Sequence, residues 1–151
     1  MSSSKEDTWD DITQPSVGVP KARVLVADDD ADMRELVTER LVSSGYYVRE
    51  AESGSDVVRL MESIGVDRKL DAVDILVIDN RMPGITGLEA IRRLRARDWQ
   101  RPAILMTAFP EDDVKREAAL LGVPILPKPF SPELLTTAVL LSLLAGPETS
   151  K

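Results

Sequence analysis

Five short apolar runs alternate along the chain with stretches that have the periodicity of amphipathic helices. The runs are rich in β-branched residues and lack strict apolar–polar alternation, which is typical of strands buried on both faces of a sheet. They are Val24–Ala27, Tyr46–Val48, Ile75–Ile78, Ala103–Met106 and Pro124–Leu126. Five strands that alternate with five helices predict right-handed βαβ units and a parallel sheet covered by helices on both faces. The sequence therefore predicts one doubly wound α/β domain.

The helical stretches carry start and stop signals. Apolar residues at i, i+3, i+4 and i+8 predict the first helix, which Gly45 would end; they are Met33, Leu36, Val37 and Leu41. The fourth helix is predicted from Val114, Ala118 and Leu121, with a stop at Gly122. The other predicted helix starts are Ser53, Thr86 or Gly87, and Ser131 followed by Pro132 and Glu133.

The composition limits the chemistry that the chain can carry. Asp and Glu total 26 against 19 Lys and Arg, and the net charge of −7 argues against a nucleic-acid surface. The absence of Cys excludes disulfides and thiolate metal sites. The absence of His excludes Ser-His-Asp catalysis, imidazole zinc sites and a phosphohistidine on this chain.

Both ends of the chain lack the periodicity of the middle. Residues 1–20 are polar and acidic without a signal-peptide pattern, so we predict a flexible N-terminal tail, a domain at residues 21–145 and a C-terminal tail at residues 146–151. The longest apolar stretches, in LLTTAVLLSLLAG, are far shorter than the ~20 residues that span a bilayer. We therefore expect a cytoplasmic protein that does not bind membranes.

Polar side chains follow four of the five predicted strands at the points where the strands end: Asp28 and Asp29, then Asp79, Thr107 and Lys128. If the strand order is 2-1-3-4-5, the second strand is an outer edge and the other four ends meet in one crevice, where ligands of such sheets bind. Carboxylates there would hold a divalent cation through oxygen, and Mg²⁺ fits because it keeps several waters. Asp30 directly precedes the helical pattern and is predicted to cap the first helix.

The residues around this crevice resemble the receiver domain of bacterial two-component response regulators. The resemblance rests on VLVADDD, ILVIDNRMPGITGLEAI, AILMTAF and ILPKPF, and it covers roughly residues 21–145. It implies a flavodoxin-like (βα)5 fold of sheet order 2-1-3-4-5. It also implies a signalling protein rather than an enzyme, which accepts a phosphoryl group from the phosphohistidine of a sensor histidine kinase or histidine phosphotransfer protein. A chain without His fits a partner that supplies phosphohistidine.

The resemblance implies a role for each matching position. Asp79 would be the phosphoacceptor, Thr107 would hydrogen-bond one phosphoryl oxygen and Lys128 would pair with another. Ala108 would leave room for the phosphoryl group, and the Lys128–Pro129 peptide would be cis. The ligands of Mg²⁺ would be Asp79, Asp29 directly, Asp28 mostly through water, and the backbone carbonyl of Arg81.

Four further positions lie close in the sequence to the predicted site residues. The family often has an aromatic residue three positions before the Lys, where this chain has Ile125, so movement of Thr107 would act on the following loop without an aromatic switch. Arg81 and Phe109 lie two residues after the phosphoacceptor and the hydroxyl residue, at rim positions that tune water access in the family. This bulky pair predicts a long phosphoryl lifetime. The rings of Phe109 and Phe130 are otherwise expected to pack against the domain.

The predicted fifth helix is apolar on two faces, although a surface helix needs only one buried stripe. One stripe holds Leu134, Ala138, Leu141 and Ala145, and the other holds Leu135, Val139 and Leu143. We expect the second stripe to remain exposed, so that Val139→Glu would disrupt binding there. The resemblance implies an output face built from the fourth helix, fifth strand and fifth helix, where we expect a homodimer or a hydrophobic partner. Cover by the N-terminal tail, with Trp9 on the helix, is the alternative.

The same residues allow other interpretations. A haloacid-dehalogenase-type phosphatase would use Asp28-x-Asp30 ahead of a Thr or Val, but Asp32 holds that position. An FMN binder is excluded because three aspartates after the first strand would repel phosphate. A receiver without phosphorylation would act only as a docking module. No attached DNA-binding or enzymatic segment is visible, so we expect a stand-alone regulator or relay intermediate, with a fragment of a larger regulator as the alternative.

Overall fold

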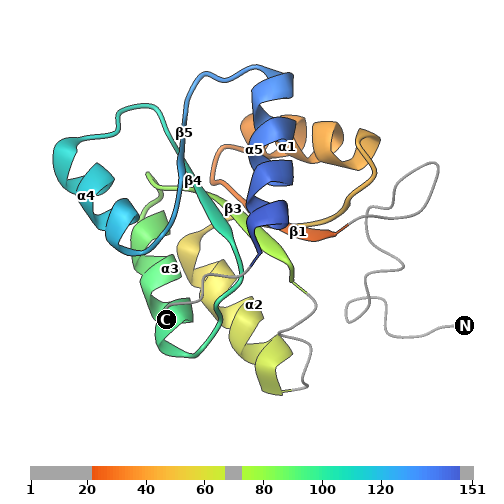
Figure 1. Cartoon of the computed structure of the whole chain (residues 1–151). Coiled ribbons are helices and arrows are strands. Elements are labelled where there is room, and N and C mark those ends of the chain that lie inside the picture. The colour runs from red at the N-terminus through yellow and green to blue at the C-terminus, as the bar shows by residue number, and fades with distance from the viewer. Residues whose placement is uncertain (1–21, 67–72, 147–151) are drawn as a thin grey trace, which may run out of the picture.

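The computed structural model describes residues 22–66 and 73–146, and within them the predicted fold is confirmed (Figure 1). Five parallel strands form one sheet in the order β2-β1-β3-β4-β5. The strands are β1 Arg23–Ala27, β2 Tyr47–Ala51, β3 Ile75–Asp79, β4 Ala103–Thr107 and β5 Ile125–Pro127. The helices that alternate with them are α1 Ala31–Ser43, α2 Gly54–Val66, α3 Gly87–Ala96, α4 Asp112–Leu120 and α5 Pro132–Ala145. The predicted N-terminal tail, including Trp9, lies outside the described residues.

The sheet is covered on both faces, and each face has its own apolar core. Successive strand residues point to opposite faces of a sheet. One core joins the strands to α2, α3 and α4 through residues that include Leu25, Leu76, Met61, Leu94 and Ala118. The other joins them to α1 and α5 through residues that include Val26, Val77, Val37, Leu41 and Val139. Because both faces are buried, the central strands β3 and β4 are buried at every position, and each is a continuous apolar run up to its last residue, Asp79 or Thr107.

The predicted helix caps are confirmed. Each capping side chain accepts a hydrogen bond from a backbone N–H of the first turn, which satisfies a donor that has no partner within the helix. The caps are Asp30 for α1, Ser53 for α2, Thr86 for α3 and Ser131 for α5. The predicted stops Gly45 and Gly122 have φ of 102° and 71°, in the left-handed region that glycine adopts without steric cost.

Three predicted positions are wrong. Leu36 was expected inside but is 61% exposed, because α1 turns Val37 and Leu41 towards the sheet instead. Val139 was expected on the exposed stripe of α5 but is fully buried, because the stripe that it shares with Leu135 is the one that meets the sheet. Phe109 was expected to pack in the domain but is 65% exposed.

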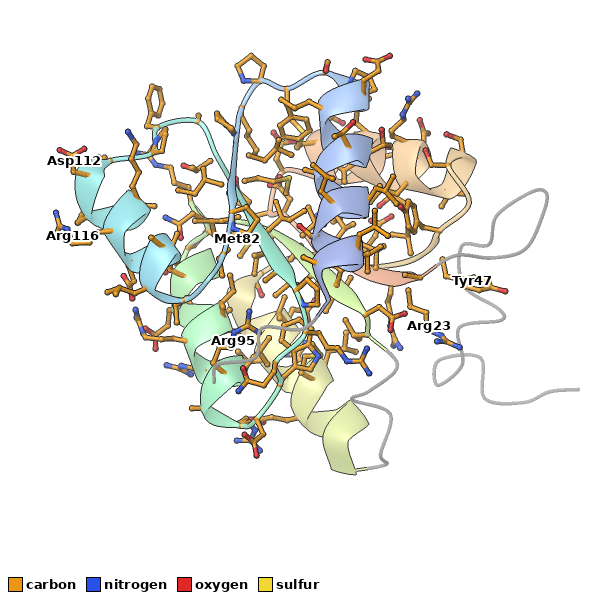
Figure 2. The ribbon with its side chains drawn as sticks, in the orientation of Figure 1. Arg23, Tyr47, Met82, Arg95, Asp112 and Arg116 are labelled. Carbon is orange, nitrogen blue, oxygen red and sulfur yellow. The ribbon has the colours of Figure 1, made fainter. Side chains whose placement is uncertain are left out.

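The helices differ in how deeply they are packed. Helix α4 buries only Ala118, and an ion pair between Arg92 and Glu117 joins it to α3. Figure 2 shows Asp112 and Arg116 on α4 directed away from the sheet.

None of the described helices combines the length and apolar character that crossing a bilayer requires.

Candidate functional site

The carboxyl ends of four strands meet at one edge of the sheet, as predicted from the strand order. Asp28 follows β1, Asp79 ends β3, Thr107 ends β4, and all three side chains are buried. Lys128 follows β5, and its amide donates a 2.9 Å hydrogen bond to the carbonyl of Thr107. Because β2 is the outer strand next to β1, its end does not contribute a side chain to this group. The structure thus brings together residues up to 100 positions apart in the sequence.

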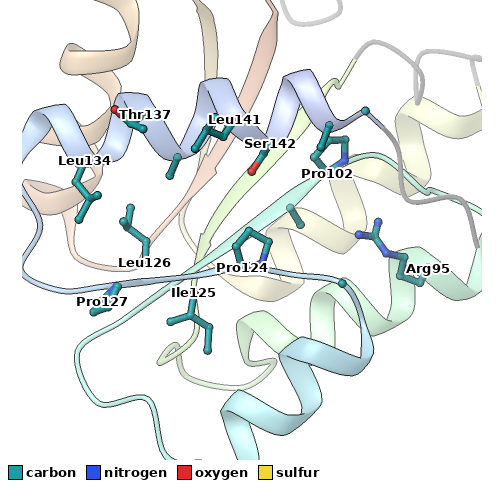
Figure 3. A pocket seen from close by; sticks show the side chains of 15 residues that line it. Arg95, Pro102, Pro124, Ile125, Leu126, Pro127, Leu134, Thr137, Leu141 and Ser142 are labelled. Carbon is teal, nitrogen blue, oxygen red and sulfur yellow. The ribbon is translucent and has the colours of Figure 1, made fainter.

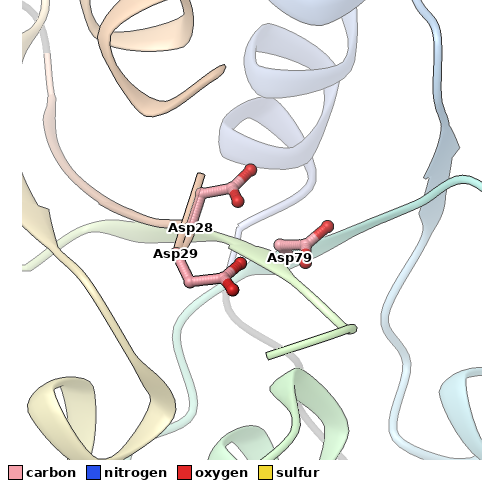
Figure 4. A group of neighbouring side chains, drawn as sticks. All are labelled: Asp28, Asp29 and Asp79. Carbon is pink, nitrogen blue, oxygen red and sulfur yellow. The ribbon is translucent and has the colours of Figure 1, made fainter. Parts of the chain in front are cut away.

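Three carboxylates and one ammonium form the centre of the site. Asp28, Asp29 and Asp79 each offer an oxygen, and these oxygens lie within 4.8 Å of one another (Figure 4). The Nζ of Lys128 lies 2.8 Å from Oδ1 of Asp79 and 3.1 Å from Oδ2 of Asp28. Asp28 and Asp79 are buried, whereas Asp29 is exposed to solvent at the mouth of the group. One ammonium among three carboxylates leaves an excess of negative charge that a cation would neutralise.

Burial and charge shift the pKa of two of these groups. Burial is the largest influence on Asp79 and raises its pKa; the charges of Asp28 and Asp29 raise it too, against the opposing hydrogen bond from Lys128. Burial alone would lower the pKa of Lys128. The hydrogen bond and charge of Asp79, together with Asp28, outweigh that effect and raise the pKa of the ammonium above its usual value. Lys128 therefore remains charged while Asp79 resists ionisation.

Local hydrogen bonds orient the carboxylates of Asp28 and Asp30. The amide of Asp30 donates to Oδ1 of Asp28 at 3.0 Å, which orients the buried carboxylate. The carboxylate of Asp30 itself accepts from the amides of Asp32 and Met33 at the start of α1. Because Asp30 caps the helix as predicted, the phosphatase reading of Asp28-x-Asp30 has no second carboxylate to place in the site.

Thr107 and the rim residues lie on the other side of the acid group. The hydroxyl oxygen of Thr107 accepts a 3.3 Å hydrogen bond from the amide of Phe109, and Ala108 between them is exposed. The guanidinium of Arg81 lies over the ring of Phe109, 5.5 Å from its centroid. The ring of Phe109 thus lies at the rim in contact with a cation and not in the core. The Lys128–Pro129 peptide is cis, as the resemblance implied.

Sequence reasoning missed Asn80, which holds the loop after β3. Its side-chain oxygen accepts a 3.0 Å hydrogen bond from the amide of Leu88, and its backbone carbonyl accepts from Gly87 at 3.2 Å. A Cβ on Gly87 would lie 2.6 Å from the carbonyl oxygen of Asp79, so only glycine permits this close approach of α3 to the strand end. The adjacency of Asn80 to the phosphoacceptor position was the one available signal.

Sequence reasoning also missed Arg34 on the first turns of α1. Its Nη1 donates a 2.7 Å hydrogen bond to the backbone carbonyl of Asp28, and its Nε donates at 3.0 Å to Glu50 of β2. The end of β2 was expected to have no companion in the site, and it acts through this arginine instead. A basic residue four positions after the cap was too weak a signal to single out.

The donor set suits a hard divalent cation. All three side chains of the acid group offer carboxylate oxygens, which Mg²⁺ and Ca²⁺ prefer, and the exposed position of Asp29 leaves room for the waters that Mg²⁺ retains. Soft metals would require thiolate or imidazole ligands, and the chain has neither Cys nor His. The residues present therefore fit Mg²⁺.

The same residues lie inside a match to a known family. The family model described as the response regulator receiver domain matches residues 24–140, a span that contains all the residues of this site. The chain belongs to the response regulator receiver family. Receiver domains bind Mg²⁺ at an acidic pocket and take phosphate from histidine kinases, and this receiver carries the acidic cluster. The match confirms the resemblance on which the sequence interpretation rested.

Curated relatives are longer than this receiver. It is 34% identical over 112 residues to the phosphate regulon transcriptional regulatory protein PhoB of Pseudomonas aeruginosa, covering 72% of this chain and 46% of PhoB. It is 39% identical over 114 residues to the response regulator MprA of Mycobacterium ulcerans, covering 74% of this chain and 45% of MprA. The chain thus spans about half the length of these relatives.

Solved receiver domains have the same fold. The receiver domain of the Francisella response regulator 1452 superposes with a TM-score of 0.72 at 26% identity, covering 83% of this chain and 98% of that one. The Vibrio cholerae chemotaxis protein CheY4 gives a TM-score of 0.69 at 28% identity, covering 81% and 98%. These chains match the receiver almost over their whole length.

Proposed function

We propose that this receiver, as a domain at residues 21–145, accepts a phosphoryl group on Asp79 from the phosphohistidine of a sensor histidine kinase or a histidine phosphotransfer protein. The single observation that carries the proposal is the position of Asp79, buried beside two further carboxylates and 2.8 Å from the ammonium of Lys128. An isolated buried carboxylate would be a poor nucleophile, but one held among charges that balance an incoming phosphoryl group is suited to phosphoryl transfer.

In this reaction an Oδ of Asp79 attacks phosphorus while the bond from phosphorus to the donor nitrogen breaks. The electron pair of that bond stays with the donor imidazole, which leaves as a neutral ring after taking up a proton. Lys128 faces the acceptor oxygen and would neutralise part of the charge on the transferred group. Thr107 would donate its hydroxyl to a phosphoryl oxygen, and the small Ala108 beside it would leave space for that oxygen.

Mg²⁺, when bound, supplies a cation that offsets the charge gathered between the carboxylates and the phosphoryl oxygens. Asp29 and Asp79 would hold it directly, Asp28 mostly through water, and the backbone carbonyl of Arg81 would complete the protein ligands. The three carboxylates that would hold the ion lie in one group, which is the feature that supports this assignment.

The switch that reports phosphorylation is proposed to run from Thr107 and Lys128 to β5. The amide of Lys128 donates to the carbonyl of Thr107, so the ends of β4 and β5 are joined by a direct hydrogen bond. If Thr107 turns towards a phosphoryl oxygen, it gives up the hydrogen bond that it accepts from Phe109, and the loop after β4 is released. Ile125 replaces the usual aromatic residue and is half-buried, so this chain transmits the change through its loop.

The output surface is proposed to be the face formed by α4, β5 and α5. Leu134, Leu141 and Leu144 of α5 are 47%, 60% and 73% exposed. Between α5 and β5 runs a groove of about 460 Å³ with a mainly apolar lining, which includes Leu126, Leu134 and Leu141 (Figure 3). An apolar partner, or a second copy of the chain, fits this surface better than a charged one.

The domain composition of the whole protein is a prediction. The relatives with about twice the length include PhoB, which is named as a transcriptional regulatory protein. A stand-alone role for this receiver, and the absence of direct contact with nucleic acid, are therefore expectations that depend on the form in which the chain occurs in the cell. Immunodetection of the native protein by size would decide between a single domain and a longer regulator.

Phosphorylation at Asp79 can be tested directly. The chain is incubated with acetyl phosphate and MgCl₂, and the adduct is located by mass spectrometry after trapping with borohydride. We expect one phosphoryl group on Asp79, no labelling in Asp79→Asn and none in the presence of EDTA. Labelling that persists in Asp79→Asn would overturn the assignment. A parent chain that takes up no phosphate would favour the alternative of a receiver that acts only as a docking module.

The output surface can be tested by sedimentation of the chain with and without the phosphoryl mimic beryllofluoride. We expect self-association or partner binding that strengthens with the mimic and is weakened by Leu141→Glu. Val139→Glu is unsuitable because Val139 is buried in the core and its replacement would unfold the domain. A chain that remains monomeric in both states, with partner binding indifferent to Leu141→Glu, would contradict the proposed surface.

A further inference from the structure

We propose that Arg34 is a positioning residue for the divalent-metal site, because its guanidinium fixes the peptide that joins Asp28 to Asp29. This inference rests on the proposed function. The Nη1 of Arg34 donates to the carbonyl oxygen of Asp28 at 2.7 Å, and that carbonyl belongs to the peptide unit whose amide is Asp29. The orientation of this peptide determines where the side chain of Asp29 begins.

The carboxylates of the acid pair differ in how they are held. Asp28 accepts a hydrogen bond from the amide of Asp30 and pairs with Lys128, so its position is fixed by two partners. Within the described residues, no hydrogen bond or ion pair to the carboxylate of Asp29 is formed. The direction of Asp29 towards the acid group therefore depends on its backbone, which makes the hydrogen bond from Arg34 the nearest constraint on it.

Arg34 also anchors this peptide to a neighbouring strand. Its Nε donates to Oε1 of Glu50 at 3.0 Å, while the amide of Asp28 donates to the carbonyl of Ala51 at 3.2 Å. Both backbone polar groups of Asp28 are thus tied, directly or through Arg34, to the end of β2. The end of β2 contributes no side chain to the site, but it acts as the support against which the acid pair is held.

The arrangement requires the shape of arginine rather than its charge alone. The guanidinium uses one edge for the carbonyl and another for the carboxylate, and a lysine ammonium does not offer this fixed planar fork. The positive charge is balanced locally, because Glu50 lies at 3.0 Å and Glu52 at 4.0 Å. The Arg34 side chain is only 13% exposed, but the side chains of Glu50 and Glu52 are 38% and 78% exposed, so solvent screens these two ion pairs. Position is therefore the main contribution of Arg34 to the metal site.

The test measures Mg²⁺ affinity without phosphorylation, by titrating MgCl₂ into ¹⁵N-labelled protein and following amide resonances. Loss of an outer partner of a metal ligand commonly weakens binding 10- to 100-fold, so we expect about 10-fold weaker Mg²⁺ binding in Arg34→Met. Arg34→Lys should weaken it nearly as much, and Glu50→Gln by a smaller factor. Arg59→Met is the matched control, because it removes an exposed ion-paired arginine from α2 and should leave Mg²⁺ binding unchanged.

The outcomes separate the possible roles of Arg34. Unchanged Mg²⁺ affinity in Arg34→Met and Arg34→Lys, even with lower thermal stability, would overturn the inference and leave a structural residue. Parent-like binding in Arg34→Lys alone would assign the effect to charge and also overturn it. If Arg34→Met does not fold, Arg34→Lys and Glu50→Gln decide the matter. Mg²⁺ binding by the parent that is absent, or that survives Asp79→Asn unchanged, would instead refute the proposed function.

Discussion

Removing the carboxylate of Asp79, the proposed phosphoacceptor, should stabilise the domain when no divalent metal is bound. Asp79 is buried at the centre of three converging carboxylates, and its raised pKa shows that the folded state disfavours its charge. Asp79→Asn keeps the shape of the side chain and an oxygen that can accept from Lys128, but it removes the charge. We therefore expect a higher free energy of unfolding in the variant when no divalent metal is present.

The geometry gives the size of the effect. Two carboxylates within 4.8 Å of Asp79 each repel it by about 3.5 kcal/mol at an effective dielectric constant of about 20. Lys128 at 2.8 Å attracts it by about 6 kcal/mol on the same scale. The balance favours the neutral side chain by about 1 kcal/mol, and relief from burying a charge adds to it. For a domain of this size that difference corresponds to an increase in Tm of about 4 °C.

The assay is thermal unfolding, followed by circular dichroism, in EDTA at pH 7. Glu35→Gln, at an exposed position of α1, is the control for the loss of one acidic side chain. An added 10 mM MgCl₂ should stabilise the parent more than Asp79→Asn, because a ligand stabilises the state that binds it. The folded pKa of Asp79 lies above its unfolded value, so the cost of the charge is absent below the unfolded pKa and grows as pH rises through the folded pKa. The advantage of the variant should therefore shrink on acidification. An Asp79→Asn variant that melts below the parent in EDTA would refute this reasoning.

Three further predictions address the readout, the rim and the packing of α2. Lys128→Ala should still accept phosphate but lose about 2 kcal/mol of the coupling between phosphorylation and partner binding, measured as the ratio of Kd values in the two states; an unaltered ratio would exclude Lys128 from the readout. The double variant Arg81→Asn/Phe109→Ser should lose its phosphoryl group several-fold faster than the parent, because the stacked pair no longer shields it; equal or slower loss would contradict shielding. Gly54→Ala should lower the free energy of unfolding in urea by about 1–3 kcal/mol, because its Cβ would lie 2.3 Å from a carbonyl oxygen of the β3–α3 loop; an unchanged unfolding midpoint would show that the loop moves aside.

The parts of the candidate site that could be predicted from the sequence lie at strand ends and at helix caps. A central strand buried on both faces is a continuous apolar run, so the residue that follows it, such as Asp79 or Thr107, is placed by the run itself. The cap at Asp30 is equally local, because its carboxylate bonds to amides two and three residues later. These features need no knowledge of distant contacts.

The residues that the sequence predictions missed or misplaced depend on contacts between elements. Arg34 reaches Glu50 across 16 residues, and no local pattern indicates that pairing. On α5 the apolar residues surround the helix, so the choice between the stripe of Leu134 and the stripe of Val139 is made by packing on the sheet and not by periodicity. Phe109 was expected to pack in the domain because its ring is hydrophobic, but the ring instead contacts the guanidinium of Arg81 at the rim of the site.

The shallow packing of α4 has a consequence for how the domain opens. Little apolar surface is exposed when a helix that buries only Ala118 separates from the sheet, so the free energy needed to unfold α4 locally is a small part of that for the whole domain. Its amide hydrogens should exchange with solvent long before those of β3 and β4, whose side chains are all buried. One wall of the proposed output face can therefore melt and re-form many times while the sheet that carries Asp79 remains intact.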